Sequence, residues 1–226
     1  VNGNRVKVSE TGRNAFVNPA QPAVQERALN IIKEIVQKYE IDGLVLDYCR
    51  YTDIDADFSD YSKSQFIDFL KAKYNDNAAA TMNFPKDIVN TWTMSGDRVV
   101  PNSTGKYYGK WLLYRASVIH DFVEKARAAV KATKPSVKFG VYVGAWYTTY
   151  YSVGVNWASN EYDPFNDQAV RFDWAYPGYK ETGYAEELEF LMTGNYFTQI
   201  RLSENPATAN LTYHWWSIEG SLNGIK

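Results

Sequence analysis

The chain has little cysteine, little histidine and no long apolar run, and each absence removes a class of protein. A single Cys excludes a disulfide framework within the chain. With one Cys and two His, we expect no zinc site. No stretch approaches the roughly 18 apolar residues that mark a membrane-spanning helix, so we expect no membrane span.

The chain also lacks a large excess of positive or negative charge. The 24 Lys and Arg residues nearly balance the 26 Asp and Glu residues, for a net charge of −2. A chain so balanced has no overall electrostatic footprint for nucleic acid, although it allows a local patch. The phosphate-binding loop, the Gly-x-Gly-x-x-Gly fingerprint and the Gly-x-Ser-x-Gly elbow are all absent. The sequence opens at Val1 on a polar segment without an initiator Met, so we expect a processed or excised segment.

Aromatic residues are plentiful: 18 Tyr, 11 Phe and 7 Trp make up 16% of the 226 residues. Many of these aromatic residues fall in a loop at about 144–180. Such a cluster suits sugar binding, because the C–H face of a sugar ring packs on an aromatic ring while Tyr hydroxyls and Asn amides bind the sugar hydroxyls. Two alternatives are a small core within the loop and a flat apolar patch for a protein partner. We expect a mixture of sugar-facing and core residues. The twelve aromatic residues between 142 and 179 are Tyr142, Trp146, Tyr147, Tyr150, Tyr151, Trp157, Tyr162, Phe165, Phe172, Trp174, Tyr176 and Tyr179.

Hydrophobic spacing predicts alternating strands and helices, which is typical of a parallel α/β sheet. The first unit is a strand near Phe16, a helix over about 22–39 and a strand at Leu44–Leu46 that reads as buried on both faces. Later elements are a helix capped by Ser59 or Ser62 and ending near Tyr74, a short helix over 85–92, a helix over 106–133, a strand over 138–143, a short helix over 185–188, a strand over 190–193 that 197–202 extends, and a helix over 216–222.

Ligands of parallel α/β sheets bind beyond the carboxyl ends of the strands, and this rule ranks the candidate residues. Asp47 follows the Leu44–Leu46 strand, where a rigid strand end suits a catalytic carboxylate; alternatively, it caps the next loop. Arg50 either pairs with Asp47 or binds a substrate oxygen. The predicted sugar-binding residues are Arg50, Tyr51, Trp146, Tyr147, Asn195 and Tyr196.

Hydrolysis of a glycosidic bond usually takes two carboxyl groups, and the second one is harder to find. Asp173 lies in aromatic surroundings and is the predicted partner of Asp47, with Asp163 nearby in the sequence. No carboxylate follows the strand that ends at Val143, which is a gap in this hypothesis. Arg115 interrupts an apolar helix stripe, so we expect it to have a carboxylate partner in a structural ion pair.

Two further features favour ordinary structural roles. Asp53, Asp55 and Asp57 have the spacing that starts a calcium loop, but Phe58 replaces the required Gly and Ser64 the closing Glu. A solvated acidic loop is therefore favoured over calcium, and we expect no cofactor. Cys49 reads as a packed thiol, since no His is placed to activate it.

The segment from Asn18-Pro19 to the Asp-Gly-Leu-Val-Leu-Asp-Tyr-Cys-Arg-Tyr run that ends at Tyr51 resembles the glycosyl-hydrolase-like family 10 proteins, and in particular the branch from polysaccharide-degrading gut bacteria. Segments 111–115, 134–140 and 190–196 are similar to later parts of that family. The resemblance implies a (β/α)-barrel fold and hydrolysis of a glycosidic bond in a polysaccharide, with Asp47 in the active site. Arg50 and Tyr51 match the same motif.

The length does not suit a complete barrel. Eight strands typically need about 250 residues, and we expect only four to five here, in an incomplete or excised barrel. Residues 1–226 are predicted as a single (β/α)-barrel catalytic segment, with an inserted helical excursion at about 52–104 and the aromatic loop at about 144–180. The missing strands would come from the rest of a longer chain or from a second copy.

We therefore predict a glycoside hydrolase that is secreted, periplasmic or at the cell surface of a bacterium, with a carbohydrate substrate and no nucleic-acid partner. The alternative is a non-catalytic carbohydrate-binding or degenerate barrel domain, in which Asp47 only binds sugar hydroxyls. A second carboxylate across a cleft from Asp47 would separate the two hypotheses.

Overall fold

A parallel sheet of three strands forms the centre of the chain in the computed structural model, which describes residues 5–12, 16–168, 172–204 and 217–225. The strand order is β1-β4-β5, and the register pairs Leu44 with Phe139 and Val141 with Leu191. The predicted parallel α/β architecture is confirmed. The strands are β1 (Gly43–Leu46), β4 (Lys138–Gly144) and β5 (Phe190–Gly194).

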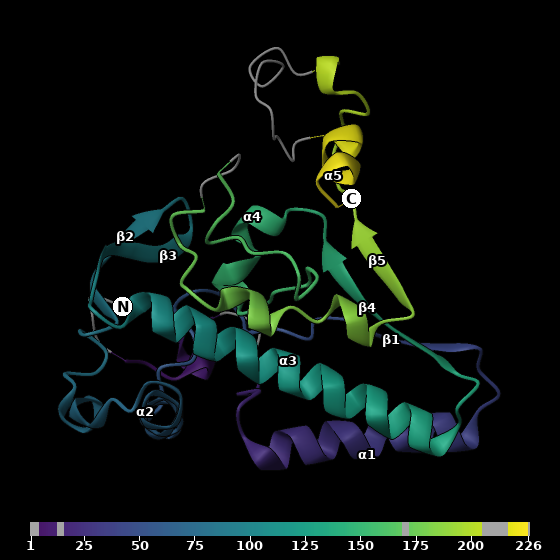
Figure 1. Cartoon of the computed structure of the whole chain (residues 1–226), viewed down its shortest axis with the longest axis horizontal. Coiled ribbons are helices and arrows are strands. Elements are labelled where there is room, and N and C mark those ends of the chain that lie inside the picture. Colours follow the sequence, from purple (N-terminus) through teal and green to yellow (C-terminus); the bar gives the residue numbers. More distant parts are fainter. Residues whose placement is uncertain (1–4, 13–15, 169–171, 205–216, 226) are drawn as a thin grey trace.

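Two long helices, α1 (Pro22–Lys38) and α3 (Tyr108–Thr133), lie side by side along one face of this sheet (Figure 1). Pro22 occupies the first turn of α1, where its missing N–H costs nothing. Both helices match the prediction closely. The core between helices and sheet is apolar and includes Ile32, Val36, Ile119, Val123, Phe139 and Val141.

The opposite face of the sheet is open. Val45 in β1 is 39% exposed and Met192 in β5 is 46% exposed, so the prediction of a β1 strand buried on both faces is wrong. Alternate residues of a strand point to opposite faces of the sheet. In β1, Leu44 and Leu46 point towards the helices, whereas Val45 points to the open face. In a closed barrel this second face would be the packed interior.

The prediction of four to five strands in the main sheet is too high for the described part of the chain, where the sheet has three. Phe16 and Val17 lie in irregular chain, although a strand was expected there, and Ala15 lies outside the described residues. Residues 197–202 do not extend β5 either; a 3-10 turn at Leu202–Glu204 follows instead. Among the described residues, neither segment 16–17 nor segment 197–202 has a neighbouring strand with which to form the hydrogen bonds of a β-sheet.

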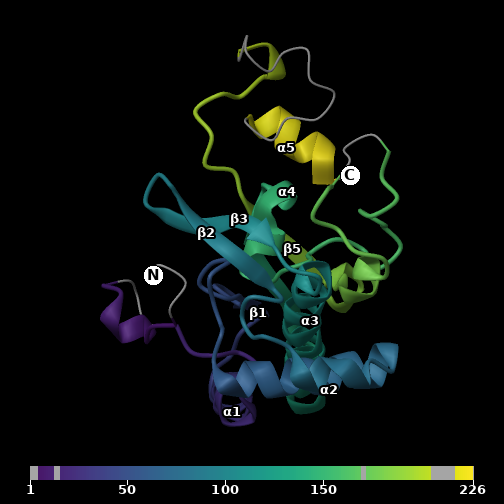
Figure 2. The same cartoon turned by 90° about the vertical axis from the view of Figure 1, so that its left-hand side faces the viewer.

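The excursion after β1 starts with α2 (Asp60–Tyr74), which Ser59 caps by accepting a hydrogen bond from the N–H of Ser62 at 3.2 Å. An antiparallel hairpin, β2 (Val89–Ser95) and β3 (Arg98–Thr104), then replaces the helix that was expected over 85–92. The Gly96-Asp97 turn, with Gly96 at φ +62°, is a hairpin signal that outweighs the helical spacing. Figure 2 shows the hairpin on the same side of the molecule as the N-terminal segment.

The remaining helices are short. The aromatic loop contains α4 (Tyr147–Tyr150), and α5 (Ile218–Ile225) ends the described chain; Trp216, the predicted start of that helix, lies outside the described residues. No helix of the described ranges has both the length and the apolar character needed to cross a membrane. The 3-10 helices are Val8–Glu10, Asn77–Thr81, Tyr151–Val153, Tyr179–Thr182, Ala185–Glu187 and Leu202–Glu204.

Arg115 on α3 is fully buried, but its partners differ from the expected carboxylate. Its guanidinium donates hydrogen bonds to the carbonyl oxygens of Asp53 at 2.7 Å and Ser152 at 3.1 Å. It also lies 4.5 Å from the ring centroid of Tyr51. Two carbonyls and an aromatic face thus take the place of an ion pair, and burial lowers the pKa of Arg115. The contacts tie the loop after β1 to the loop after β4.

Candidate functional site

The three parallel strands deliver their carboxyl ends to one edge of the sheet. Asp47 follows β1, Trp146 follows β4 and Tyr196 follows β5. These three residues and Arg50 line one cavity of about 250 Å³. The structure therefore brings four of the predicted site residues together at the edge where ligands of parallel sheets bind.

Asp47 is exposed at the edge of this cavity. Its Oδ1 accepts a hydrogen bond from the N–H of Tyr48 at 2.7 Å. Tyr48 has φ +52°, a left-handed conformation that is uncommon outside Gly. The chain turns sharply there, which leaves the Asp47 carboxylate at the mouth of the sheet with its second oxygen available to a ligand.

Arg50 is the cationic side chain of the cavity wall. Its guanidinium donates to the carbonyl oxygens of Tyr51 at 3.3 Å and Thr52 at 3.2 Å, and it lies 4.7 Å from the ring centroid of Tyr48. Within the described ranges it forms no ion pair with Asp47. A guanidinium has five N–H donors, so Arg50 retains donors for a substrate oxygen.

Tyrosine side chains form much of the remaining wall; Tyr196 was predicted from the sequence, whereas Tyr48, Tyr142, Tyr150 and Tyr184 were not among the predicted site residues. Tyr142 and Tyr196 share a hydrogen bond between their hydroxyls. That hydrogen bond, followed by desolvation and by the charges of Tyr196 and Asp47, raises the pKa of Tyr142 to about 12. The Tyr142 phenol is therefore protonated at neutral pH and can donate a hydrogen bond. The signal was present: Tyr142 alternates with Val141 and Val143, so it points away from the helix face.

Two glycines make room for the aromatic rings of this wall. A side chain at Gly144 would collide with the ring of Trp146, and one at Gly194 would collide with the Tyr142 hydroxyl and the Tyr196 ring. Trp146 in turn lies 6.1 Å from the Tyr196 ring centroid. Glycine at these two strand ends thus lets large rings close over the backbone.

The other predicted site residues lie elsewhere. Tyr147 is 4% exposed, and its hydroxyl donates to Asn156 at 2.9 Å within the core. Tyr51 is 3% exposed beneath Arg115. Asn195 is half-buried and donates to the carbonyl of Thr193 at 3.2 Å. None of the three lines the Asp47 cavity, and their roles in sugar binding stay predictions.

Asp47 is the one carboxylate that the described residues contribute to the wall of its cavity. Asp173 is exposed on the aromatic loop and does not line this cavity. Asp163 accepts hydrogen bonds from the N–H of Phe165 and the amide of Asn166, which is a turn role. The pairing of Asp47 with Asp173 stays a prediction.

Many rings of the aromatic loop pack into the core that the helices and the sheet share, so the loop does not form a separate core. Only Trp146, Tyr150 and the strand residue Tyr142 border the Asp47 cavity. A flat apolar patch for a protein partner is therefore not favoured, because most of the rings pack inwards. Those that are buried are Tyr147, Trp157, Phe172 and Tyr179.

The acidic run at 53–57 is engaged in local contacts. Asp53 forms a two-point ion pair with Arg98, with Nη2 at 2.5 Å and Nε at 2.9 Å. Asp57 accepts hydrogen bonds from Ser59 and Ser62. In the described part of the chain, no group of three or more His, Cys, Asp or Glu side chains is placed to hold a metal ion.

Cys49 offers a direct test of this environment, because it is the only cysteine of the chain. Burial raises the pKa of its thiol to about 12, so the thiolate is scarce at pH 8. We expect Cys49 of the folded protein to react with a disulfide reagent such as DTNB at least about 100-fold more slowly than in the urea-unfolded protein. Equal rates would show that the thiol is neither buried nor perturbed.

The fold and the site define an α/β protein that presents a carboxylate, a guanidinium and aromatic side chains at the carboxyl edge of a parallel sheet. Comparison with known families makes this more specific. The chain belongs to the glycosyl hydrolase-like 10 family, whose model matches residues 2–176.

A curated relative is the S-layer-related protein of Niallia circulans, which is 35% identical over 195 residues. That alignment covers 84% of this chain but 11% of the relative, so the chain spans about a tenth of that protein's length. Two solved structures also match in part. The PgaB (BpsB) glycoside hydrolase domain from Bordetella bronchiseptica has a TM-score of 0.48 at 11% identity, covering 92% of this chain and 46% of that one. Beta-galactosidase from Bacillus circulans sp. alkalophilus has a TM-score of 0.48 at 15% identity, covering 84% and 27%.

Proposed function

We propose that this chain carries the active site of a glycoside hydrolase and that Asp47 is one of its catalytic carboxylates. The observation that carries the proposal is the position of Asp47 at the carboxyl end of β1, in one cavity wall with Arg50, Trp146 and Tyr196. A strand end holds a carboxylate rigidly at the place where parallel sheets bind ligands. Membership of a glycosyl hydrolase-like family supports the same reaction class.

The wall residues suit a sugar in the subsite beside Asp47. Trp146 provides an aromatic face for the C–H face of a pyranose. Arg50 and the hydroxyls of Tyr142 and Tyr196 donate hydrogen bonds to sugar oxygens. Asp47 acts as nucleophile or as acid, depending on the position of its partner carboxylate.

We further propose that the chain is part of an incomplete barrel whose remaining strands come from the rest of a longer chain or from a second copy. The open inner face of the sheet supports this, because a barrel interior is filled with side chains. The partner carboxylate is then either Asp173 or a residue on those strands. The far greater length of the S-layer-related relative agrees with a longer chain.

A second candidate is a non-catalytic carbohydrate-binding domain built on the same fold. It is favoured by one observation: the described residues place no second carboxylate in the wall beside Asp47. Under this hypothesis Asp47 accepts hydrogen bonds from sugar hydroxyls, and the protein binds glycans without releasing products.

For location, we propose a secreted, periplasmic or cell-surface bacterial protein. The name of the S-layer-related relative agrees with the cell surface. An origin in polysaccharide-degrading gut bacteria stays a prediction.

Product analysis tests the proposed function. The full-length protein is incubated with α-glucans, β-glycans and peptidoglycan, and new reducing ends and oligosaccharides are followed over time. We expect release from at least one of these polymers. Binding without any release would favour the carbohydrate-binding candidate, and neither binding nor release would contradict both candidates.

A further inference from the structure

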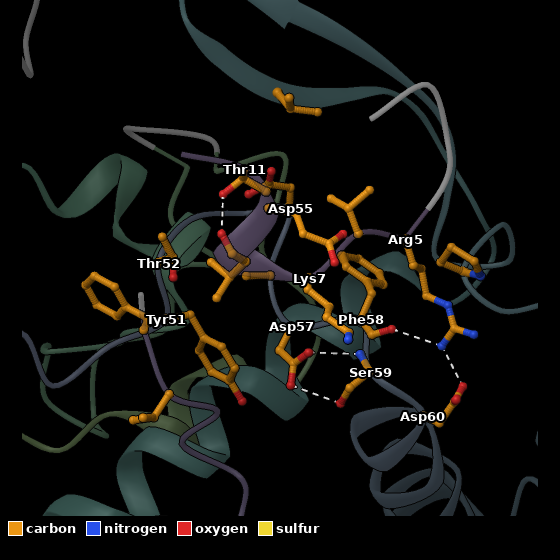
Figure 3. A pocket seen from close by; sticks show the side chains of 18 of the residues that line it. Arg5, Lys7, Thr11, Tyr51, Thr52, Asp55, Asp57, Phe58, Ser59 and Asp60 are labelled. Carbon is orange, nitrogen blue, oxygen red and sulfur yellow. Dashed lines mark hydrogen bonds and ion pairs between the residues drawn. The ribbon is translucent and has the colours of Figure 1, made fainter. Parts of the chain in front are cut away.

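A second and larger cleft, of about 910 Å³, lies beside the Asp47 cavity and was not anticipated from the sequence. Its walls come from three distant segments: the N-terminal residues 5–11, the loop 51–60 after β1, and the hairpin with Trp92 and Val99. Figure 3 shows the side chains of Lys7, Asp55 and Asp57 extending into the same hollow. The excursion after β1 thus builds a cleft at the ligand-binding edge of the sheet.

The size and the aromatic wall of this cleft suit a ligand of several rings. Small-molecule sites typically measure about 300–1,000 Å³, so this cleft lies at the upper end while the Asp47 cavity lies below the range. Phe58 and Trp92 form the aromatic wall, with ring centroids 5.7 Å apart. Phe58 is stacked on the buried Trp111 at 5.2 Å, which holds this wall in place.

The polar groups of the cleft are also held in position. The Oδ1 of Asp57 accepts a hydrogen bond from the N–H of Ser59 at 2.9 Å, and its Oδ2 accepts from the hydroxyls of Ser59 at 3.0 Å and Ser62 at 3.1 Å. Among the described lining residues, the carboxylates Glu10, Asp55, Asp57 and Asp60 outnumber the cations Arg5 and Lys7, and Arg5 pairs with Asp60 at 2.5 Å. This excess of negative charge disfavours ligands that carry carboxylate, sulfate or phosphate groups.

Arg50, which lines the Asp47 cavity, lies near a residue of the large cleft. Its guanidinium lies 5.6 Å from the ring centroid of Phe16, which lines the large cleft, and 4.7 Å from that of Tyr48, which lines the Asp47 cavity. The rings of Phe16 and Tyr48 are themselves in contact at 6.0 Å. A ligand that extended from one cavity to the other would therefore pass close to Arg50.

We propose that the large cleft binds an uncharged glycan chain over several sugar units, and that this chain continues past Arg50 to Asp47. Phe58 and Trp92 stack on sugar faces, while Asp55, Asp57 and Lys7 bind hydroxyls. The binding site stands on the cleft alone; only the continuation to Asp47 rests on the proposed function.

The test measures chain-length-dependent binding by calorimetry, using the full-length Asp47→Asn protein so that no ligand is consumed. The probes are maltohexaose and cellohexaose, each with its disaccharide, and hexagalacturonate as the acidic probe. We expect one neutral hexasaccharide to bind more tightly than its disaccharide. Adding Trp92→Ala should weaken hexasaccharide binding about tenfold and leave disaccharide binding unchanged.

Matched variants separate binding from folding. Met94→Ala alters the same strand at a side chain that is 62% exposed and outside the cleft lining, so it should bind like the parent. Lys7→Ala alters an exposed side chain of the N-terminal segment and should weaken hexasaccharide binding several-fold without affecting the fold. Unchanged hexasaccharide affinity in both Trp92→Ala and Lys7→Ala, or binding of hexagalacturonate alone, would overturn the proposal.

The two proposals can fail separately. If the wild-type protein hydrolyses no glycan but Trp92→Ala and Lys7→Ala still weaken hexasaccharide binding, the cleft is a glycan site and the proposed hydrolase activity is wrong. If the wild-type protein hydrolyses a glycan and both variants keep the same preference for long substrates, the hydrolase proposal stands and the cleft proposal is wrong.

Discussion

Asp47→Asn is expected to lower the rate of glycan hydrolysis by about 10²-fold to 10⁴-fold or more, while glycan binding persists. The amide has nearly the shape of the carboxylate and its oxygen still accepts the hydrogen bond from the N–H of Tyr48, so the sharp turn after β1 is retained. What is lost is the negative charge and the ability to hold a proton or attack the sugar. Initial rates on the polymer found by product analysis measure this directly.

A carboxylate-to-amide change away from the sheet edge is the matched control. Glu34 lies exposed on α1 and pairs with Lys38 at 2.6 Å, so Glu34→Gln should leave the rate unchanged. Turnover by Asp47→Asn at the rate of this control would exclude Asp47 as a catalytic group. Asp173→Asn, measured in parallel, tests the predicted pairing: an equal loss assigns the second carboxylate to Asp173, and full activity assigns it to strands outside the described sheet.

Arg115→Met is expected to lower the free energy of unfolding by about 3 kcal/mol. Arg115 lines neither the Asp47 cavity nor the large cleft, so this effect concerns stability. Methionine fills a similar volume but leaves the part-buried carbonyl groups of Asp53 and Ser152 without their donors. Each unpaired buried carbonyl costs roughly 1–3 kcal/mol, and the contact with the Tyr51 ring is lost as well. Urea unfolding followed by circular dichroism gives the change.

Arg127→Met on the same helix is the control for the loss of an arginine. Arg127 is part-exposed, and its nearest carboxylate oxygen, on Glu187, is 3.7 Å away, so we expect a change below about 1 kcal/mol. Equal stability of the two variants would show that the carbonyl contacts of Arg115 contribute little. A larger effect at Arg115 would confirm that a buried cation holds the loops around the site.

The sequence predicts the regular part of the fold well, and the reason is local. The apolar stripe of α1 and the Leu44–Leu46 run have periods that distinguish helix from strand, so those elements were found near their observed ends. Asp47 was placed at a strand end by the same argument. The hairpin at 89–104 was not predicted, because the spacing over 85–92 indicates a short helix while the strand pairing depends on the Gly96-Asp97 turn.

The candidate site was predicted only in part, because side-chain direction depends on packing between distant segments. Trp146 and Tyr147 are neighbours in sequence, yet Trp146 lines the Asp47 cavity and Tyr147 is buried against Asn156. Composition alone gives both the same affinity for a sugar or for a core. The carboxylate expected beside Arg115 is likewise replaced by backbone carbonyls, which no residue pattern reveals.

By itself the sequence determined the parallel α/β class, the family and the carboxylate at the end of β1, since all three follow from short-range patterns along the chain. Only the tertiary structure decided which aromatic rings are core, that one face of the sheet is open, and that the N-terminal segment, the loop after β1 and the hairpin enclose a large cleft. The physical reason is that the cleft is made by contacts between segments about 35 to 90 residues apart, and the free energy of those contacts is not encoded in any one segment.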